Sequence, residues 1–316
     1  MRTFLALVVA ALLLVAAGGS GTFADTATDA PQPAVGSEAT RKAELGAAWK
    51  DVQAAAVKGP TEIPLLSQAA LKLPAGFAFI PPKESNRLMR AWGNSAAGDG
   101  FLGMVFPTSD ENWFITVNYV DAGYVKDAEA KNWDIDALLK ASQDGVEADN
   151  ADRVARGFNK IKVDGWIEKP IYDDTQHRLV YSMALSDFDA KPGDETSVNY
   201  HTYALGREGY FALDLVTGSN AIDGFKDRAR TVLATLEYKS GKGYNDYVAS
   251  TDRVAEYGIA ALIGGLAAKK LGLLALGGVA IAKFGGALVA FAKPLIAATV
   301  ALFAGVARFF RRRPKA

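Results

Sequence analysis

The chain has 316 residues, of which 50% are hydrophobic and 22% charged, and its 35 basic side chains equal its 35 acidic ones. The balance is uneven, because residues 254–316 hold nine basic residues and one acidic residue, whereas residues 1–253 hold 26 basic and 34 acidic residues. An acidic body joined to a basic, apolar tail argues against a single neutral soluble globule, and the absence of cysteine excludes disulfides, zinc–thiolate sites and thiol nucleophiles.

The amino terminus has the pattern of a secretory signal peptide. Arg2 is followed by an unbroken apolar stretch at residues 4–17 and then by small residues at 18–21. This order predicts removal of residues 1–24. The alternative is a retained anchor, but a stretch of 14 residues is shorter than the roughly 20 that a spanning helix needs.

The carboxyl-terminal region has the pattern of a membrane span. Residues 284–307 are apolar except for Lys293, and as a helix they would reach about 36 Å, enough to cross a hydrocarbon layer of about 30 Å. The basic residues 308–316 follow and predict a cytoplasmic end. We therefore predict a single-pass protein of the cytoplasmic (inner) membrane, anchored in the lipid bilayer by this tail, with its main domain on the extracytoplasmic, periplasmic side.

The apolar residues 251–283 admit three arrangements: an interfacial helix, a re-entrant hairpin, or the first span of a two-helix tail. Lys269 and Lys270 divide this stretch, and at mid-membrane each would cost about 2.5 to 3.5 kcal/mol. We favour interfacial or re-entrant helices that insert only in part. Glycine pairs at 264–265 and 277–278 permit close helix approach, and they suggest a homo-oligomer formed through these helices.

The residues between the two ends predict an α+β domain. Residues 25–58 read as a flexible lead-in and a helix that begins after Ser37, and residues 59–250 as the folded extracytoplasmic domain. Short turns join the later strands, which predicts a mainly antiparallel sheet with flanking helices. The predicted strands are 61–66, 70–73, 77–80, 100–106, 113–120, 162–170, 178–186, 197–205, 210–217 and 234–238, and the predicted helices are 38–57, 83–92, 128–145, 149–157 and 224–233.

Several runs of sequence carry a resemblance to known proteins. They are "LKLPAGFAFIP" (71–81), "WGN" (92–94), "NYVDAGYVKD" (118–127), "VDGWIEKPIYD" (163–173), "VNYHTYALGREG" (198–209) and "YNDYVASTDRVAEYGIAALIGG" (244–265). Through them the chain resembles a bacterial family of uncharacterised membrane-anchored proteins, defined by a domain of unknown function. The resemblance implies an envelope protein with a signal, an outside domain and a membrane tail, and no established activity.

A second resemblance concerns the fold. The opening "LPAGFAFIPP" (73–82) and the closing helix and strand "FKDRARTVLATLEY" (225–238) follow the order of elements in the compact sandwiches of the PsbP and Mog1 type. This resemblance implies a sandwich architecture and no function, since one fold hosts many functions.

Catalytic and metal-binding motifs are sparse. The two histidines, His177 and His201, have no partner at metal-ligand spacing, and we predict structural or surface roles for them. A nucleophile elbow of the G-x-S-x-G type and a phosphate-binding loop are absent from the sequence. Acidic residues at 187–195 lack the spacing of a calcium loop, so we predict neither a metal nor a cofactor.

Aromatic residues beside amides and charges form the candidate binding patch, because such surfaces are common at interfaces. The alternative is that these rings are core and edge residues of the sheet. The patch comprises Trp92, Asn94, Tyr124, Lys126, Asp127, Trp166, Tyr172, Asn199 and Arg207.

These observations predict a binding protein rather than an enzyme. The expected partner is an unknown envelope protein or a small ligand, and nucleic acid is disfavoured because an acidic body repels phosphates. The alternative is a carboxylate-dependent hydrolase acting in the envelope, which requires paired carboxylates in a cleft.

Overall fold

The computed structural model describes residues 38–264, except residues 93, 95–96, 156–158, 192–193, 195 and 219–220. The α-helices in this part of the chain are α2 (Glu38–Ala55), α3 (Pro82–Ala91), α4 (Ile135–Ala155) and α5 (Ile222–Ala234), and the 3-10 helices are η2 (Ala128–Asn132) and η3 (Tyr244–Asp246). The strands are β1 (Val57–Lys58), β2 (Thr61–Leu65), β3 (Ala69–Leu73), β4 (Phe77–Ile80), β5 (Phe101–Pro107), β6 (Phe114–Val120), β7 (Tyr124–Lys126), β8 (Ile161–Asp173), β9 (Arg178–Asp187), β10 (Ser197–Leu205), β11 (Tyr210–Gly218), β12 (Leu236–Tyr238) and β13 (Val254–Gly258).

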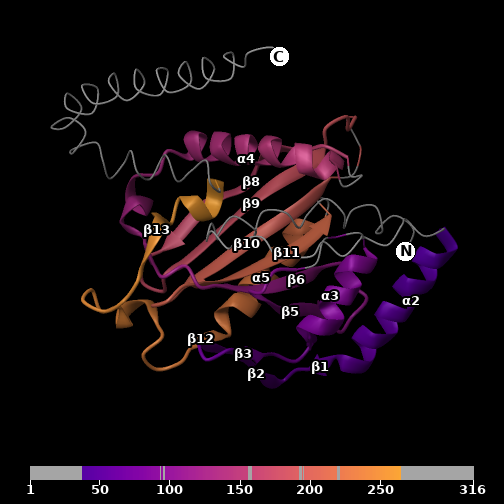
Figure 1. The fold of residues 1–316 in the computed structure, drawn as a ribbon, viewed down its shortest axis with the longest axis horizontal. Coiled ribbons are helices and arrows are strands. Elements are labelled where there is room, and N and C mark those ends of the chain that lie inside the picture. Colours follow the sequence, from indigo (N-terminus) through magenta and orange to yellow (C-terminus); the bar gives the residue numbers. More distant parts are fainter. Residues whose placement is uncertain are drawn as a thin grey trace, which may run out of the picture. The chain divides into compact units, whose positions relative to one another are not determined.

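An eight-stranded sheet forms the centre of the domain (Figure 1). Its strand order is β1-β4-β5-β6-β11-β10-β9-β8, and every neighbouring pair is antiparallel. The predicted α+β class, a mainly antiparallel sheet with flanking helices, is thereby confirmed.

One face of this sheet is covered by α5 and by a small sheet of order β12-β3-β2. Apolar residues of β2 and β3, such as Leu65 and Leu71, pack with Ile115 and Phe211 of the large sheet and with Val232 of α5. All five are at most 1% exposed, so the layers enclose a continuous core.

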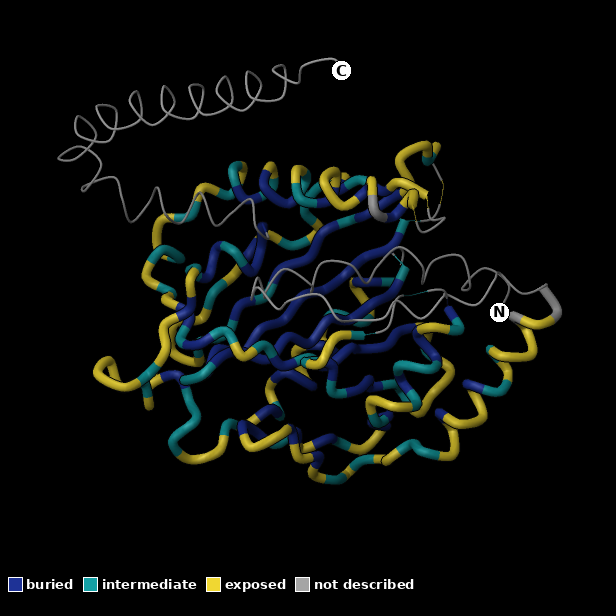
Figure 2. The backbone as a smooth tube through the Cα atoms, viewed as in Figure 1, coloured by how far each residue is buried: buried dark blue, intermediate teal, exposed yellow. Residues whose placement is uncertain are grey.

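The opposite face carries two separate apolar clusters. One lies with α4 on the β8–β10 side and includes Leu138 and Met183, and the other lies with α2 and α3 on the β4–β6 side and includes Val52 and Phe114. Because both faces are covered, every residue of β10 is buried, and the central strands are dark blue in Figure 2.

The helices between β7 and β8 differ from the prediction of two helices at 128–145 and 149–157. The first part is the 3-10 helix η2, and α4 starts after Asp134, whose Oδ1 accepts hydrogen bonds from the backbone of Asp136 and Ala137. Gly145 does not end the helix. One continuous helix, α4, therefore crosses the predicted break between residues 145 and 149.

The folded domain continues beyond the predicted boundary at residue 250. β13 pairs in parallel with β7, and Ile259 and Ile263 are fully buried among the α4-side core residues. Tyr181 donates a hydrogen bond of 2.8 Å to the carbonyl of Leu262, and Ser142 donates one of 3.0 Å to that of Ile263. The first residues of the predicted interfacial region thus belong to the domain.

Membrane crossing was predicted for residues 284–307. Within the part of the chain that the structure describes, none of the helices combines the length and the apolar character needed to span a membrane. The predicted span, the signal peptide and the rest of the 251–283 region beyond Gly264 lie outside the described residues.

Candidate functional site

Four stacked rings form a column at the end of the domain where β7 and β13 pair. In order they are Tyr247, Tyr124, Tyr244 and His177, with successive ring centroids 3.9, 4.4 and 4.1 Å apart and interplanar angles of 16°, 28° and 29°. Three segments far apart in sequence supply these rings: β7, the region of η3, and the turn between β8 and β9. We refer to these four residues as the ring column.

The backbone holds the column in place at two points. Tyr244 is buried, and its hydroxyl donates a hydrogen bond of 2.9 Å to the carbonyl of Val125. His177 has a φ of 54°, in the left-handed region that non-glycine residues rarely adopt. This conformation turns the imidazole onto Tyr244, and such outliers cluster at functional sites.

A polar trio adjoins the last ring of the column. The Tyr172 hydroxyl donates a hydrogen bond of 2.6 Å to Asp127 Oδ2. His177 Nδ1 lies 3.1 Å from that hydroxyl and 3.4 Å from the same carboxylate oxygen. On the other side of the ring, Nε2 lies 3.2 Å from the side-chain oxygen of Asn245. We call Asp127, Tyr172 and His177 the polar trio.

The polar trio is partly accessible to solvent, and its tyrosine stays protonated. The side chain of His177 is 14% exposed and that of Asp127 is 25% exposed. Burial, reinforced by the negative charge of Asp127, holds the pKa of Tyr172 well above its usual range. Tyr172 is therefore a hydrogen-bond donor to Asp127 at any physiological pH.

Ion pairs fix the segment that carries Tyr244 and Tyr247. Arg207 binds Asp252 through two hydrogen bonds of 2.6 and 2.8 Å, and Asp252 also accepts the backbone N–H of Val248 at 2.7 Å. The guanidinium of Arg207 is the main cause that lowers the pKa of Asp252. Arg207, predicted as a binding residue, therefore has a structural contact here: through Asp252 it fixes the backbone at Val248, the residue after Tyr247 of the column.

The predicted patch is brought together only in part. Tyr124, Asp127 and Tyr172 meet in the ring column and the polar trio. Lys126 is exposed beside them at the end of β7, where its carbonyl accepts the Ile259 N–H at 3.0 Å.

The other predicted residues lie elsewhere in the fold. Trp92 is buried under α3, with its ring 5.2 Å from that of Phe114, and Asn94 ends α3 through two hydrogen bonds to the carbonyl of Met89. Trp166 on β8 packs edge-on against Tyr181, and Asn199 is buried on β10. For Trp92 the alternative prediction, a residue of the core, is therefore the correct one.

His177, Tyr244 and Tyr247 are the site residues that sequence reasoning missed. The sequence gives them no motif, because the three polar partners of His177 are distant from one another along the chain. They are Tyr172 on β8, Asp127 just before η2, and Asn245 in η3. The available signal was the run at 244–265, which carries part of the family resemblance and contains two of the three.

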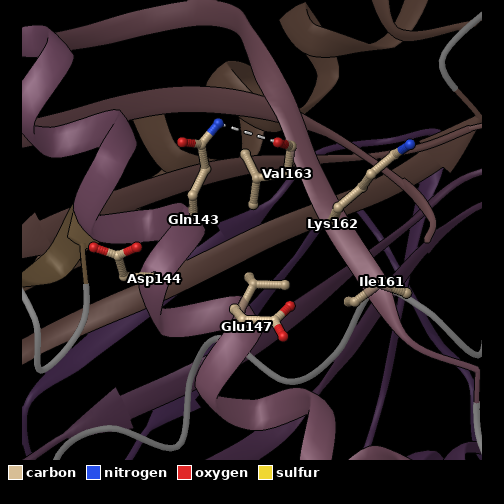
Figure 3. A pocket seen from close by; sticks show the side chains of 7 residues that line it. Gln143, Asp144, Glu147, Ile161, Lys162 and Val163 are labelled. Atoms are coloured by element: carbon tan, nitrogen blue, oxygen red, sulfur yellow. Dashed lines mark hydrogen bonds between the residues drawn. The ribbon is translucent and has the colours of Figure 1, made fainter.

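A shallow cavity of about 290 Å³ lies elsewhere, between α4 and β8 (Figure 3). Its two carboxylates are already engaged, since Asp144 pairs with Lys140 and Glu147 accepts a hydrogen bond of 3.0 Å from Asn150. Lys162 extends away from both carboxylates. Among the described residues no group of three or more histidine or acidic side chains is placed to hold a metal ion.

Comparison with known proteins yields a family and several structural neighbours, including the two that follow. The sequence profile of a family described as "Protein of unknown function (DUF2167)" matches residues 57–293, and a search of curated proteins gave no match. The solution structure of cyanobacterial PsbP (CyanoP) from Synechocystis is 10% identical, with a TM-score of 0.35 over 57% of this chain and 92% of that one. The Ran-binding protein Mog1p of Saccharomyces cerevisiae is also 10% identical, with a TM-score of 0.30 over 57% and 96%.

Proposed function

The chain belongs to the DUF2167 family, whose function is unknown, and from that premise we propose that it is a membrane-anchored envelope protein whose extracytoplasmic domain binds a protein or small ligand. The single observation that carries the binding role is the ring column with its polar trio. Aromatic rings, an imidazole, a carboxylate and a tyrosine hydroxyl meet there at a partly exposed end of the domain. This is the composition that binding surfaces favour.

The site is also pre-organised. His177 holds an unfavourable backbone conformation, and Tyr172 and Asn245 contact its two ring nitrogens. A site whose rotamers are already fixed loses less conformational entropy when a ligand binds.

Binding fits the carboxylates of the site better than hydrolysis does. Asp127 accepts the Tyr172 hydroxyl, and Asp173 accepts the backbone N–H groups of Thr175 and Gln176 in the adjoining turn. A hydrolase that uses paired carboxylates needs one as an acid and the other as a base or nucleophile, roughly 5 to 10 Å apart across the substrate. Both carboxylates here serve hydrogen bonds within the protein.

The sequence supports the membrane part of the proposal at both ends. The apolar stretch 4–17 and the apolar stretch 284–307 with its arginines give the same topology, with the acidic domain outside. The structure adds that residues up to Gly264 are fixed to the domain, through Tyr181 and Ser142 among others.

The absence of cysteine allows a direct test of this topology. Single cysteines introduced at Val248, which is 43% exposed, and at Ala316 report the two sides of the membrane. We expect an impermeant maleimide to label Val248→Cys in intact spheroplasts, and Ala316→Cys only after the membrane is permeabilised. Labelling of Ala316→Cys in intact spheroplasts, or release of the protein by carbonate, would overturn the membrane topology.

A further inference from the structure

Helix α2 packs against α3 and contributes little to the core (Figure 1). Of its described residues only Ala48 and Val52 are buried, and most of the helix is yellow or teal in Figure 2. The shorter helix α5 buries four residues, which are Ile222, Ala229, Val232 and Leu233. A segment with few buried side chains opens at a lower free-energy cost than one with many. The domain therefore holds α2 more weakly than α5.

One arginine of α3 binds two carboxylates of α2. Arg87 donates hydrogen bonds from Nε to Glu44 Oε1 at 2.9 Å, from Nη2 to Glu44 Oε2 at 3.1 Å, and from Nη1 to Asp51. Glu44 and Asp51 are two helical turns apart, so both lie on the same side of α2. Their side chains are 49% and 50% exposed, and solvent and salt weaken ion pairs of this kind. We refer to these three residues as the Arg87 contact.

The surface beneath α2 is apolar. Ala48 and Val52 of α2 belong to one cluster with Leu88 of α3, and Phe106 of β5 packs at its margin. Trp49 lies edge-on to the ring of Phe106, with centroids 5.7 Å apart, and is 40% exposed. An apolar surface bordered by a charged anchor is the kind of surface on which amphipathic helices dock.

The charge of α3 is opposite to that of the domain as a whole. Helix α3 holds three basic residues and one acidic residue, whereas residues 38–264 hold 25 basic and 33 acidic side chains. Arg87 chiefly, and Arg90 at longer range, lower the pKa of Glu44 below its usual value. The positive charge of α3 therefore favours a partner that presents carboxylates.

We propose that this surface of α3 is the docking site for an amphipathic helix of a partner protein, and that α2 occupies it in the partner's absence. The partner helix would present what α2 presents: two carboxylates seven residues apart, and small or apolar side chains on the same stripe. The family profile matches residues 57–293, so the surface lies within the matched region and α2 lies outside it. The proposal does not involve the ring column, so either can fail without the other.

The absence of cysteine makes the displacement of α2 measurable in the full chain in mild detergent. Val52→Cys, at a position 3% exposed, reacts with a maleimide only while α2 is displaced, whereas Leu71→Cys, fully buried in β3, reacts only when the domain unfolds. We expect Val52→Cys to react more than roughly tenfold faster than Leu71→Cys. Equal rates would show that α2 leaves only on global unfolding, and they would overturn the proposal.

A synthetic peptide of residues 38–56 serves as the partner helix. It should accelerate the labelling of Val52→Cys in proportion to its concentration until α2 is fully displaced, because it binds only the open state. The same peptide with Glu44→Lys and Asp51→Lys should have no effect. No acceleration by the first peptide, or equal acceleration by both, would overturn the proposal. A dimer of the full chain that Arg87→Gln dissociates would make the α2 of a second copy the occupant, and would equally overturn a separate partner.

Substitution of the arginine tests the same contact from the other side. Arg87→Gln should accelerate the labelling of Val52→Cys by about threefold and abolish the effect of the peptide. The matched control is Arg228→Gln on α5, which removes an arginine that is 47% exposed and paired with Glu111, and it should change neither. Identical behaviour of the two variants would contradict the proposal. Should Arg87→Gln fail to fold, the comparison of the two peptides on the chain with Arg87 intact still decides.

Discussion

The imidazole of His177 lies against the ring of Tyr244, with centroids 4.1 Å apart, although the backbone of His177 must adopt a φ of 54° to place it there. A glycine at that position would relax the backbone but would remove a ring from the column. At this position, therefore, the residue that best suits the backbone, glycine, differs from the residue that completes the ring column, histidine.

Substitutions at His177 test this separation. Both His177→Ala and His177→Gly remove the ring, but only alanine retains the cost of a left-handed backbone, about 1 to 2 kcal/mol. We expect the glycine variant to be the more stable of the two by about 1 kcal/mol in urea unfolding of the full chain in mild detergent. Equal stabilities would show that the left-handed conformation is not maintained in solution.

The hydrogen bond between Tyr172 and Asp127 makes a second prediction. Tyr172→Phe keeps the ring and leaves Asp127 without its donor, so the free energy of unfolding should fall by about 1 to 2 kcal/mol. Tyr247→Phe, a half-buried tyrosine in the same column, is the control and should change it by less than about 0.5 kcal/mol. The prediction fails if the two variants lose the same stability.

The pairing of Arg207 with Asp252 predicts a pH dependence. The folded-state pKa of Asp252 is lowered, so its stabilisation is complete above the unfolded pKa, about 3.9, and is lost as the pH falls through the folded value. We expect Asp252→Asn to lower the melting temperature at pH 7, with a difference from the wild type that stays constant down to about pH 5 and shrinks below about pH 4. A difference that does not change with pH would refute a charged pair.

The burial of Ile263 predicts where the domain ends. Ile263→Ala should destabilise the full chain by about 2 to 5 kcal/mol, because the side chain is fully buried in the α4-side cluster. Val248→Ala, at an exposed position, should cost less than about 0.5 kcal/mol. If Ile263→Ala unfolds at the same urea concentration as the wild type, the segment after β13 does not belong to the domain.

The sheet could be predicted because its signals are local. Alternation and turn residues between 161 and 218 set β9, β10 and β11 to within a residue of the observed bounds. The order β6-β11-β10 could not be read in this way, since the pairing of Phe211 with Tyr119 joins strands that are separated along the chain by α4 and by four other strands, β7 to β10.

The misplaced elements have a common physical cause. β13 was read as part of an apolar tail because its burial depends on β7, a strand of three residues with no pattern of its own. α4 was divided at Gly145, although adding a Cβ there would meet no atom closer than the carbonyl oxygen of Gly264 at 3.9 Å. In both cases a tertiary partner decides what the local sequence leaves open.

The sequence predicts the kinds of residue that form the candidate site, but it does not predict which residues come together there. Tyr124, Asp127 and Tyr172 were identified as aromatic and polar neighbours, and they do meet. His177 was assigned a structural or surface role because its partners are distant in sequence, and the buried pair of His201 with Asp214 depends on strand register. Register and loop packing are the properties that one sequence specifies least.

The most direct test of the binding role is photo-crosslinking in intact cells from a single cysteine beside the ring column. Val248→Cys carrying a benzophenone maleimide should form a specific adduct, which is lost when His177→Gly is added and absent when the probe sits at Gln53→Cys on α2. The account predicts that the adduct depends on the ring of His177. An adduct that forms equally from Gln53→Cys, or that persists without that ring, would contradict the ring column as a binding site.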